Sequence, residues 1–115
     1  MNSAAKMQKA LNLFQQYTGK RDVPVTWITL LLVIAEAGEA GAGSDELLKR
    51  VGVAQGIISR TVRLLSTYYD KSLGSMAGCE LVTVTPDPRN RRQFTNILTP
   101  RGRELMAALE KVLGN

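Results

Sequence analysis

Apolar residues in the first part of the chain recur every three or four positions, at Ala4, Met7, Leu11 and Phe14. This spacing predicts an amphipathic helix over residues 3–17. Gly19 and Pro24 then interrupt the pattern, because both residue types break helices. A second helix, capped by Thr26 and running to about Ala37, is apolar on nearly every face, so we expect it to be the central helix.

Residues 44–69 have the pattern of two helices joined by a tight turn. Ser44 is a good N-cap for the first of them. Gly52 stands where that helix must end in a left-handed residue. A longer helix over residues 55–69 follows, with inward-facing positions at Ile58, Val62 and Leu65.

The region after this helix-turn-helix contains two runs with strand character. We expect a loop over residues 70–78, followed by β-branched strands at 81–85 and 94–98 that pair as a hairpin. Pro86 and Pro88 fall at its turn, since neither fits a central strand.

A last helix is predicted over residues 100–113. Thr99 can cap it, and Pro100 can occupy its first position, where a missing N–H costs nothing. The predicted fold is therefore mainly α with a small β-hairpin (α+β). It is a winged helix-turn-helix forming a single domain over residues 1–115, with the wing hairpin at 81–98.

The net charge of +5 is unevenly distributed. Between Lys49 and Arg103, ten basic residues stand against three acidic ones, so this segment carries +7; the remainder, with five basic and seven acidic residues, carries −2. The excess falls on the helix-turn-helix and the hairpin, where a polyanion would dock. The hydrophobic content of 44% excludes general disorder. The segregation favours nucleic-acid binding over an ordinary solvated surface.

The richest apolar run, residues 25–37, is too short to span a bilayer, and the N-terminus lacks a signal-peptide core. The single cysteine, Cys79, cannot form an internal disulfide, so we expect a reducing cytoplasm. Glu80 is adjacent and would raise the thiol pKa, so Cys79 is expected to be a small half-buried residue rather than a redox sensor. The chain has no histidine and no second cysteine, so neither a metal nor another cofactor is expected.

The helix from Gln55 is the predicted DNA-reading element. Glutamine can bond an adenine edge, and arginine can bond guanine or phosphate. Gly56 lets the backbone approach closely, and Ser59 and Thr61 can donate to phosphate. No acidic residue lies within 50–69, which favours DNA over an ordinary exposed helix face. The predicted contacts are Gln55, Gly56, Ser59, Arg60, Thr61 and Arg63.

Arginines crowd the turn of the predicted wing, and a structural role alone does not explain like charges so close together. Asp87 is expected to orient one of them through a salt bridge, leaving another to enter the minor groove. The sequence does not assign these two jobs to particular arginines. The predicted DNA contacts of the wing are Arg89, Asn90, Arg91 and Arg92.

Residues 87–102 (DPRNRRQFTNILTPRG) resemble the wing-to-helix signature of the MarR family of winged-helix regulators, and residues 52–62 (GVAQGIISRTV) look like its recognition-helix entry. The resemblance implies homodimers, joined by N- and C-terminal helices, that bind palindromic operators and usually repress transcription. By the same resemblance, Ser59 and Arg60 match recognition-helix positions, and Arg91 matches the wing arginine.

The likeness covers about residues 25–113 and has three departures. The family usually has aspartate before the paired wing arginines, where this chain has Asn90. The segment 65–78, between recognition helix and wing, is longer than in the family. The C-terminal part is one short helix in place of the family's long dimerisation arm.

Dimerisation is therefore expected to depend on helices 3–17 and 100–113, whose apolar stripes suit pairing. The stripe residues are Met7, Leu11, Phe14, Leu105, Leu109 and Val112. The alternative is that these stripes close on the chain's own core.

The leading hypothesis is sequence-specific binding of double-stranded DNA by a homodimeric transcriptional repressor. The recognition helix would lie in the major groove, with the wing on the minor groove or backbone. The alternatives are a plasmid or phage DNA-binding protein for partition or replication control, and a winged-helix protein-interaction module. An enzyme is not expected, because paired carboxylates and a phosphate-binding glycine loop are missing. Binding of an unknown small-molecule effector is a further possibility that the sequence leaves open. The expected location is a prokaryotic cytoplasm, on the nucleoid or a plasmid.

Overall fold

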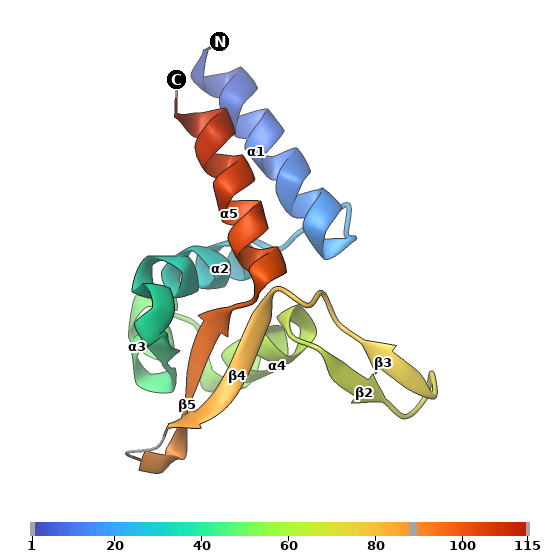
Figure 1. The fold of residues 1–115 in the computed structure, drawn as a ribbon, viewed down its shortest axis with the longest axis vertical. Coiled ribbons are helices and arrows are strands. Elements are labelled where there is room, and N and C mark those ends of the chain that lie inside the picture. Colours follow the sequence, from blue (N-terminus) through green and yellow to red (C-terminus); the bar gives the residue numbers. More distant parts are fainter. Residues whose placement is uncertain (1, 88–89, 115) are drawn as a thin grey trace.

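The computed structural model describes residues 2–87 and 90–114, without the side chains of 90–92. In the described chain the elements are α1 (Ser3–Thr18), α2 (Val25–Ala37), η1 (Gly38–Ala40), β1 (Ala42–Gly43), α3 (Ser44–Val51), α4 (Gln55–Leu65), β2 (Tyr68–Asp70), β3 (Ser75–Ala77), β4 (Val82–Asp87), β5 (Asn90–Leu98) and α5 (Pro100–Leu113). Figure 1 shows an α1–α5 pair above a body formed by α2, α3, α4 and the β4–β5 hairpin. The predicted fold class, mainly α with a small antiparallel hairpin, is confirmed.

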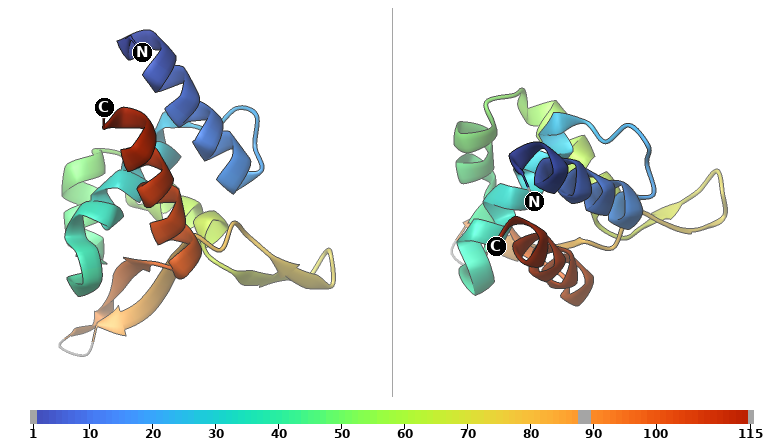
Figure 2. Two further views of the ribbon diagram at one scale, coloured as in Figure 1. Left: turned by 45° about the horizontal axis from the view of Figure 1, so that its top comes forward. Right: turned by 90° about the horizontal axis from the view of Figure 1, so that it is seen from above.

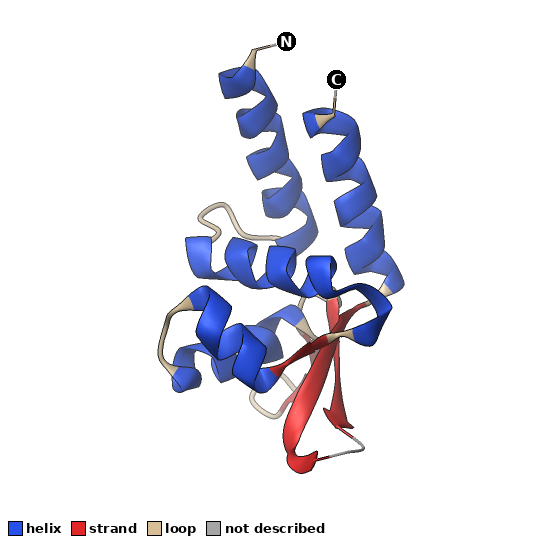
Figure 3. Cartoon of the chain, turned by 90° about the vertical axis from the view of Figure 1, so that its left-hand side faces the viewer, coloured by secondary structure: helices blue, strands red, loops and turns tan. Residues whose placement is uncertain are grey.

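Helices α1 and α5 lie side by side, and the start of α1 and the end of α5 lie at the same end of this pair (Figures 1 and 3). α1 begins where the Asn2 side chain accepts a backbone hydrogen bond at 2.8 Å, and it ends at Gly19 in the left-handed conformation, with φ 74°. α5 begins as predicted, with Thr99 as its cap and Pro100 in its first turn. No helix in the described part of the chain has the length and apolar character needed to cross a bilayer.

Helix α2 is the central helix, as its apolar composition predicts. Leu30, Leu31 and Ile34 are fully buried, so this helix supplies the middle of the core. The predicted cap at Thr26 is wrong. The helix starts one residue before Thr26 because Pro24 takes the N-cap position and its carbonyl accepts the first helical hydrogen bonds.

Helices α3 and α4 form the predicted helix-turn-helix, and Gly52 ends α3 with φ 73°. Ser44 is the first helical residue rather than the predicted N-cap. Its hydroxyl instead donates to the carbonyl of Phe94 and accepts from its N–H, both at 3.3 Å, which ties α3 to β5. α4 ends at Leu65 and not at residue 69, because Ser66 takes an extended backbone and its hydroxyl donates to a last-turn carbonyl at 2.8 Å.

The wing hairpin is part of a three-stranded antiparallel sheet with the order β1-β5-β4. Its strands are present where predicted and extend further toward the turn. Pro86, predicted at the turn, instead lies in β4, an edge strand, where a missing N–H is tolerated. Pro88 lies outside the described residues. Asn96 of β5 is buried and donates to the carbonyl of Ala42 in β1 at 3.0 Å, so the minimal strand β1 closes the sheet on the other side.

The prediction of a loop over residues 70–78 is wrong, because most of this segment belongs to a second hairpin, β2–β3. Tyr68 and Tyr69 favour extended structure. Asp70 organises the turn by accepting a hydrogen bond from the N–H of Ser72 at 2.9 Å. Figure 2 shows that this hairpin projects from the body in a different direction from the β4–β5 hairpin.

Candidate nucleic-acid interface

Helix α4 has one exposed face and one buried face, as its periodicity predicts. Ile58, Val62 and Leu65 anchor the buried face in the core. No carboxylate occurs anywhere on α4. The exposed face carries Gln55, Gly56, Ser59, Arg60 and Arg63.

Thr61 does not belong to this face. Its side chain is 4% exposed, so the prediction that its hydroxyl donates to phosphate is wrong. Position 61 is three residues after Ile58 and next to Val62, so the helical period turns it toward the core.

A groove of about 630 Å³ runs between the helix-turn-helix and the base of the β4–β5 hairpin. Gln55, Ser59 and Arg63 line it from α4, and Val84 and Phe94 line it from the sheet. Phe94 is 47% exposed here, although it is a large aromatic residue. The exposed face of α4 and the β4–β5 hairpin therefore border one concave surface. Sequence reasoning missed the two sheet residues. Their available signal was a position two residues from buried Val82 and Asn96, which places them on the same strand face.

Arg63, at the last turn of α4, has an aromatic neighbour. Its Cζ lies 4.6 Å from the ring centroid of Tyr68 in β2. The helix-turn-helix and the second hairpin therefore meet at this arginine.

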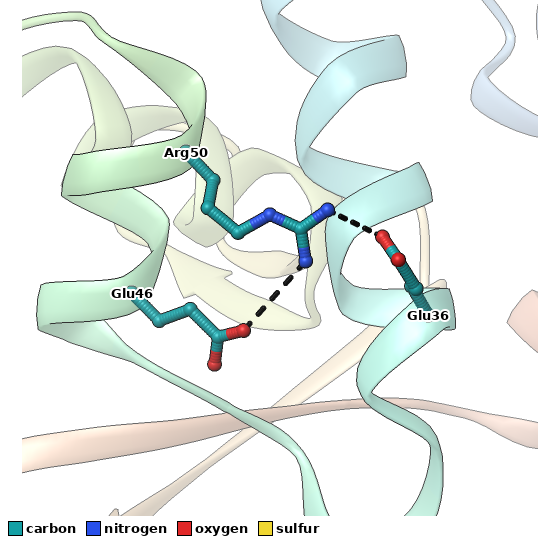
Figure 4. A network of polar contacts seen from close by, with 3 residues as sticks. All are labelled: Glu36, Glu46 and Arg50. Atoms are coloured by element: carbon teal, nitrogen blue, oxygen red, sulfur yellow. Dashed lines mark hydrogen bonds and ion pairs between the residues drawn. The ribbon is translucent and has the colours of Figure 1, made fainter.

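Arg50 is paired with two carboxylates. Its guanidinium contacts Glu36 of α2 and Glu46 one turn earlier on α3 (Figure 4). The hydrogen bond and the charge of Glu36 raise the pKa of Arg50 above its usual value. Arg50 therefore ties α2 to α3, and its charge is balanced within the molecule.

Two further arginines of the basic segment bind backbone carbonyls. The Arg101 guanidinium donates to the carbonyls of Tyr17, at 2.8 Å, and Cys79, and it stacks over the Tyr17 ring. Arg103 donates to the carbonyl of Leu98 at 3.1 Å. Among the described residues of the segment, these three arginines therefore have internal contacts, and their donors are already used within the molecule.

The predicted wing contacts lie outside the described residues. This holds for Arg89 entirely and for the side chains of Asn90, Arg91 and Arg92, so their roles stay predictions. Asp87 is half-buried at the end of β4, where the strand register shifts and its backbone pairs with residue 90.

The apolar stripes of α1 and α5 divide between core and surface. Phe14, Leu105 and Leu109 are at most 4% exposed within one chain. The prediction that these three form a dimer interface is wrong, because they close α1 and α5 on the chain's own core. The remaining stripe residues are exposed or half-buried: Met7 (55%), Leu11 (43%) and Val112.

Cys79 is half-buried, as expected, and its Sγ donates to the carbonyl of Thr18 at 3.5 Å. Burial raises the pKa of its thiol, against the opposing charges of Arg101 and Lys20. The predicted cause, the charge of Glu80, is wrong. Among residues 2–87 and 90–114, acidic and cysteine side chains form no cluster of three that could hold a metal ion.

The sequence matches no protein-family model and no curated protein. Its fold resembles solved structures. The S. aureus MepR–DNA complex gives a TM-score of 0.71 at 18% identity, over 96% of this chain and 77% of that chain. A structure of MarR gives a TM-score of 0.60 at 25% identity, over 95% of this chain and 70% of that chain. The transcriptional repressor CouR, bound to a 23-mer DNA duplex, gives a TM-score of 0.58 at 18% identity, over 97% of this chain and 70% of that chain. The expected MarR-like winged-helix fold is confirmed.

Proposed function

We propose that this MarR-like winged helix binds double-stranded DNA sequence-specifically, as a homodimer that represses transcription. The observation that carries the proposal is the exposed face of α4, which combines amide, hydroxyl and guanidinium groups with no carboxylate. Such a face offers donors for base edges and for phosphates. The DNA-bound structures of MepR and CouR, which share the fold, support this role.

In the proposed complex, α4 lies in the major groove with its N-terminal half against the bases. Gln55, at the start of the helix, binds an adenine edge, and Arg60 binds guanine or phosphate. Ser59 donates to phosphate. A Cβ added at Gly56 would meet no described atom within 4 Å, so glycine is not needed there for the fold and instead keeps the backbone open to DNA.

The β4–β5 hairpin borders the same groove and would rest on the neighbouring minor groove or backbone. Asp87 would orient one of the wing arginines, as the sequence predicts. The proposed contacts of the wing are Arg89, Asn90, Arg91 and Arg92.

The proposed dimer contacts are Met7 and Leu11 of α1, together with Val112 of α5. Two large apolar side chains one helical turn apart are exposed on α1, and a second copy would cover them. The α1–α5 pair stands at the opposite end of the molecule from strands β4 and β5 (Figure 1). Pairing there leaves both α4 faces open for two half-sites about one helical turn apart.

The test is selection of duplexes from a random pool, followed by affinity measurements across a salt series. Affinity should fall steeply with salt, because each neutralised phosphate releases counterions. Arg60→Ala should weaken binding and flatten the slope. Arg21→Ala, in the exposed loop between α1 and α2, is the matched control and should leave both unchanged. A flat wild-type slope, or equal effects of the two changes, would contradict the proposal.

A second experiment separates reading of bases from contact with phosphates. Gln55→Ala should relax the preference at one base pair, removing about 1–3 kcal/mol of discrimination there, while other positions keep theirs. Repeating the selection with this variant measures the change directly. An unchanged consensus would show that Gln55 does not read a base.

A further inference from the structure

We infer that the β2–β3 hairpin orients Arg63 for DNA, with Tyr68 as the positioning residue. The inference rests on the proposed function, because it concerns how one side chain of the α4 face is presented. The hairpin begins three residues after α4 ends.

The Tyr68 ring lies against the Arg63 guanidinium, with 4.6 Å between Cζ and the ring centroid. A ring attracts a cation over its face without neutralising it. A guanidinium carries five N–H donors, so contact with one ring leaves most of them available. Arg63 is exposed and lines the groove beside α4. The ring therefore holds the arginine at the edge of the proposed DNA surface.

The carboxylate of the hairpin is occupied elsewhere. Asp70 accepts hydrogen bonds from the hydroxyl of Ser72 at 2.6 Å, the N–H of Ser72 at 2.9 Å and the N–H of Leu73 at 3.3 Å. The bond from the Ser72 hydroxyl is the main cause that lowers the pKa of Asp70, and the charge of Arg63 is the weakest. The ion pairs found among the described side chains belong to Arg50, and none involves Arg63. The positive charge of Arg63 is thus left for a phosphate or base.

Backbone contacts fix the base of the hairpin to α4. The N–H groups of Cys79 and Leu81 donate to carbonyls of the last α4 turn, at 3.0 Å and 2.8 Å. Gly78 has a φ of +105°, and a Cβ there would lie 1.8 Å from the carbonyl oxygen of Ser66. Glycine therefore allows the chain to return this close to the helix. The hairpin that carries Tyr68 is therefore held by α4, the same helix that carries Arg63.

A long side chain that is already oriented loses less rotational freedom when it binds. For one arginine, this difference corresponds to roughly threefold to tenfold in affinity. Loss of the aromatic face should therefore weaken binding by about that factor.

The test measures affinity for a duplex selected by the wild-type chain. Tyr68→Leu, which keeps an apolar side chain but no π face, and Tyr68→Ala should each weaken binding by about threefold to tenfold. Tyr68→Phe should bind like the wild type. Tyr69→Ala is the matched control, because Tyr69 is the exposed neighbour on the same strand and should leave affinity unchanged. Wild-type affinity in Tyr68→Leu would overturn the inference, and thermal unfolding confirms that each variant is folded.

A double-mutant cycle provides a readout that a merely structural role would not move. In an Arg63→Ala background, Tyr68→Leu should cause no further loss, whereas equal losses in both backgrounds would overturn the inference. Nitrogen-15 relaxation of the Arg63 side-chain N–H in the free protein should show more order in wild type and Tyr68→Phe than in Tyr68→Leu. If the wild type bound no duplex, the proposed function would fail. The relaxation experiment would still decide whether Tyr68 orders Arg63.

Discussion

At the residue scale, Arg101 and Gly102 show what the end of the wing motif does. Arg101 joins the end of α1 to the segment after β3 through two carbonyls. A Cβ on Gly102 would lie 2.3 Å from the carbonyl oxygen of Leu81, so glycine lets α5 begin this close to β4. The motif that resembles a DNA-binding signature therefore ends in residues that hold α1, α5 and the wing together.

Gly102→Ala should destabilise the fold by about 2 kcal/mol, because the added methyl meets a backbone oxygen that cannot rotate away. Chemical denaturation measures this change. Gly56→Ala is the matched control: it meets open space on a helix and should be neutral or stabilising by up to about 1 kcal/mol. An equal loss in both variants would show that the contact at Gly102 is not the cause.

Gly56→Ala also tests the proposed interface. If the backbone of α4 approaches DNA closely at this position, the added methyl should weaken duplex binding while stability is kept. Unchanged affinity would place DNA further from the start of α4.

Cys79 should make stability depend on alkaline pH. Its folded thiol has a raised pKa because of burial, so the folded chain keeps the proton to higher pH than the unfolded chain. This contribution is complete below the unfolded thiol pKa, about 8.5, and is lost as the pH rises toward the folded value. The free energy of unfolding of the wild type, relative to Cys79→Ala, should fall as the pH rises above the unfolded thiol pKa. A constant difference would contradict the prediction.

At the element scale, α1 and α5 use one apolar stripe for two purposes. Its inner residues, Phe14, Leu105 and Leu109, close the core of one chain. Met7 and Leu11 remain exposed on α1. The same stripe can therefore stabilise the monomer with its buried residues and offer a pairing surface with its exposed ones.

Introducing charged residues at the exposed stripe positions should test the pairing surface separately from the core. Met7→Glu with Leu11→Glu should shift light scattering toward the monomer. Compared at a concentration where the wild type is also monomeric, the double variant should leave the unfolding temperature nearly unchanged. Phe14→Ala should instead cost about 3 kcal/mol or more of stability, because it empties a buried site. If the glutamate pair unfolded the chain, the two residues would belong to the core rather than to an interface.

At the scale of the whole molecule, the two proposed surfaces lie apart. The chain extends over 46 × 33 × 26 Å, with the α1–α5 pair at one end and the β4–β5 hairpin at the other (Figure 1). A dimer built at the helical end presents two α4 faces at a fixed separation, so it should sense the phase of two half-sites along the duplex.

Lengthening the spacer between half-sites by about five base pairs should therefore turn one half-site to the opposite face of the DNA. Affinity should then drop by about a hundredfold, to that of a single half-site, because the second contact is no longer held close. Titrations of paired duplexes by fluorescence anisotropy would measure the ratio. Equal affinity for both spacings would contradict a rigid twofold dimer.

The elements that could be predicted from sequence are those with local causes. Left-handed Gly52 ends α3, Thr99 caps α5, and helical periodicity exposes Arg60 while it buries Ile58. Each signal depends on residues within a turn or two of one another, because backbone preference and apolar spacing act over that range. The winged-helix class and most of the exposed face of α4 followed from such signals.

The tertiary structure alone decided which side chains meet. Arg101 reaches a carbonyl 84 residues earlier in the chain, so no local pattern could mark it as internal rather than DNA-facing. An apolar stripe looks the same whether it will fill the core, as Phe14 does, or face a second copy, as proposed for Met7. The pairing of Arg63 with Tyr68 likewise required a hairpin whose base is held by contacts outside itself. Local sequence sets backbone preference, whereas partnership depends on which distant segments the fold brings together.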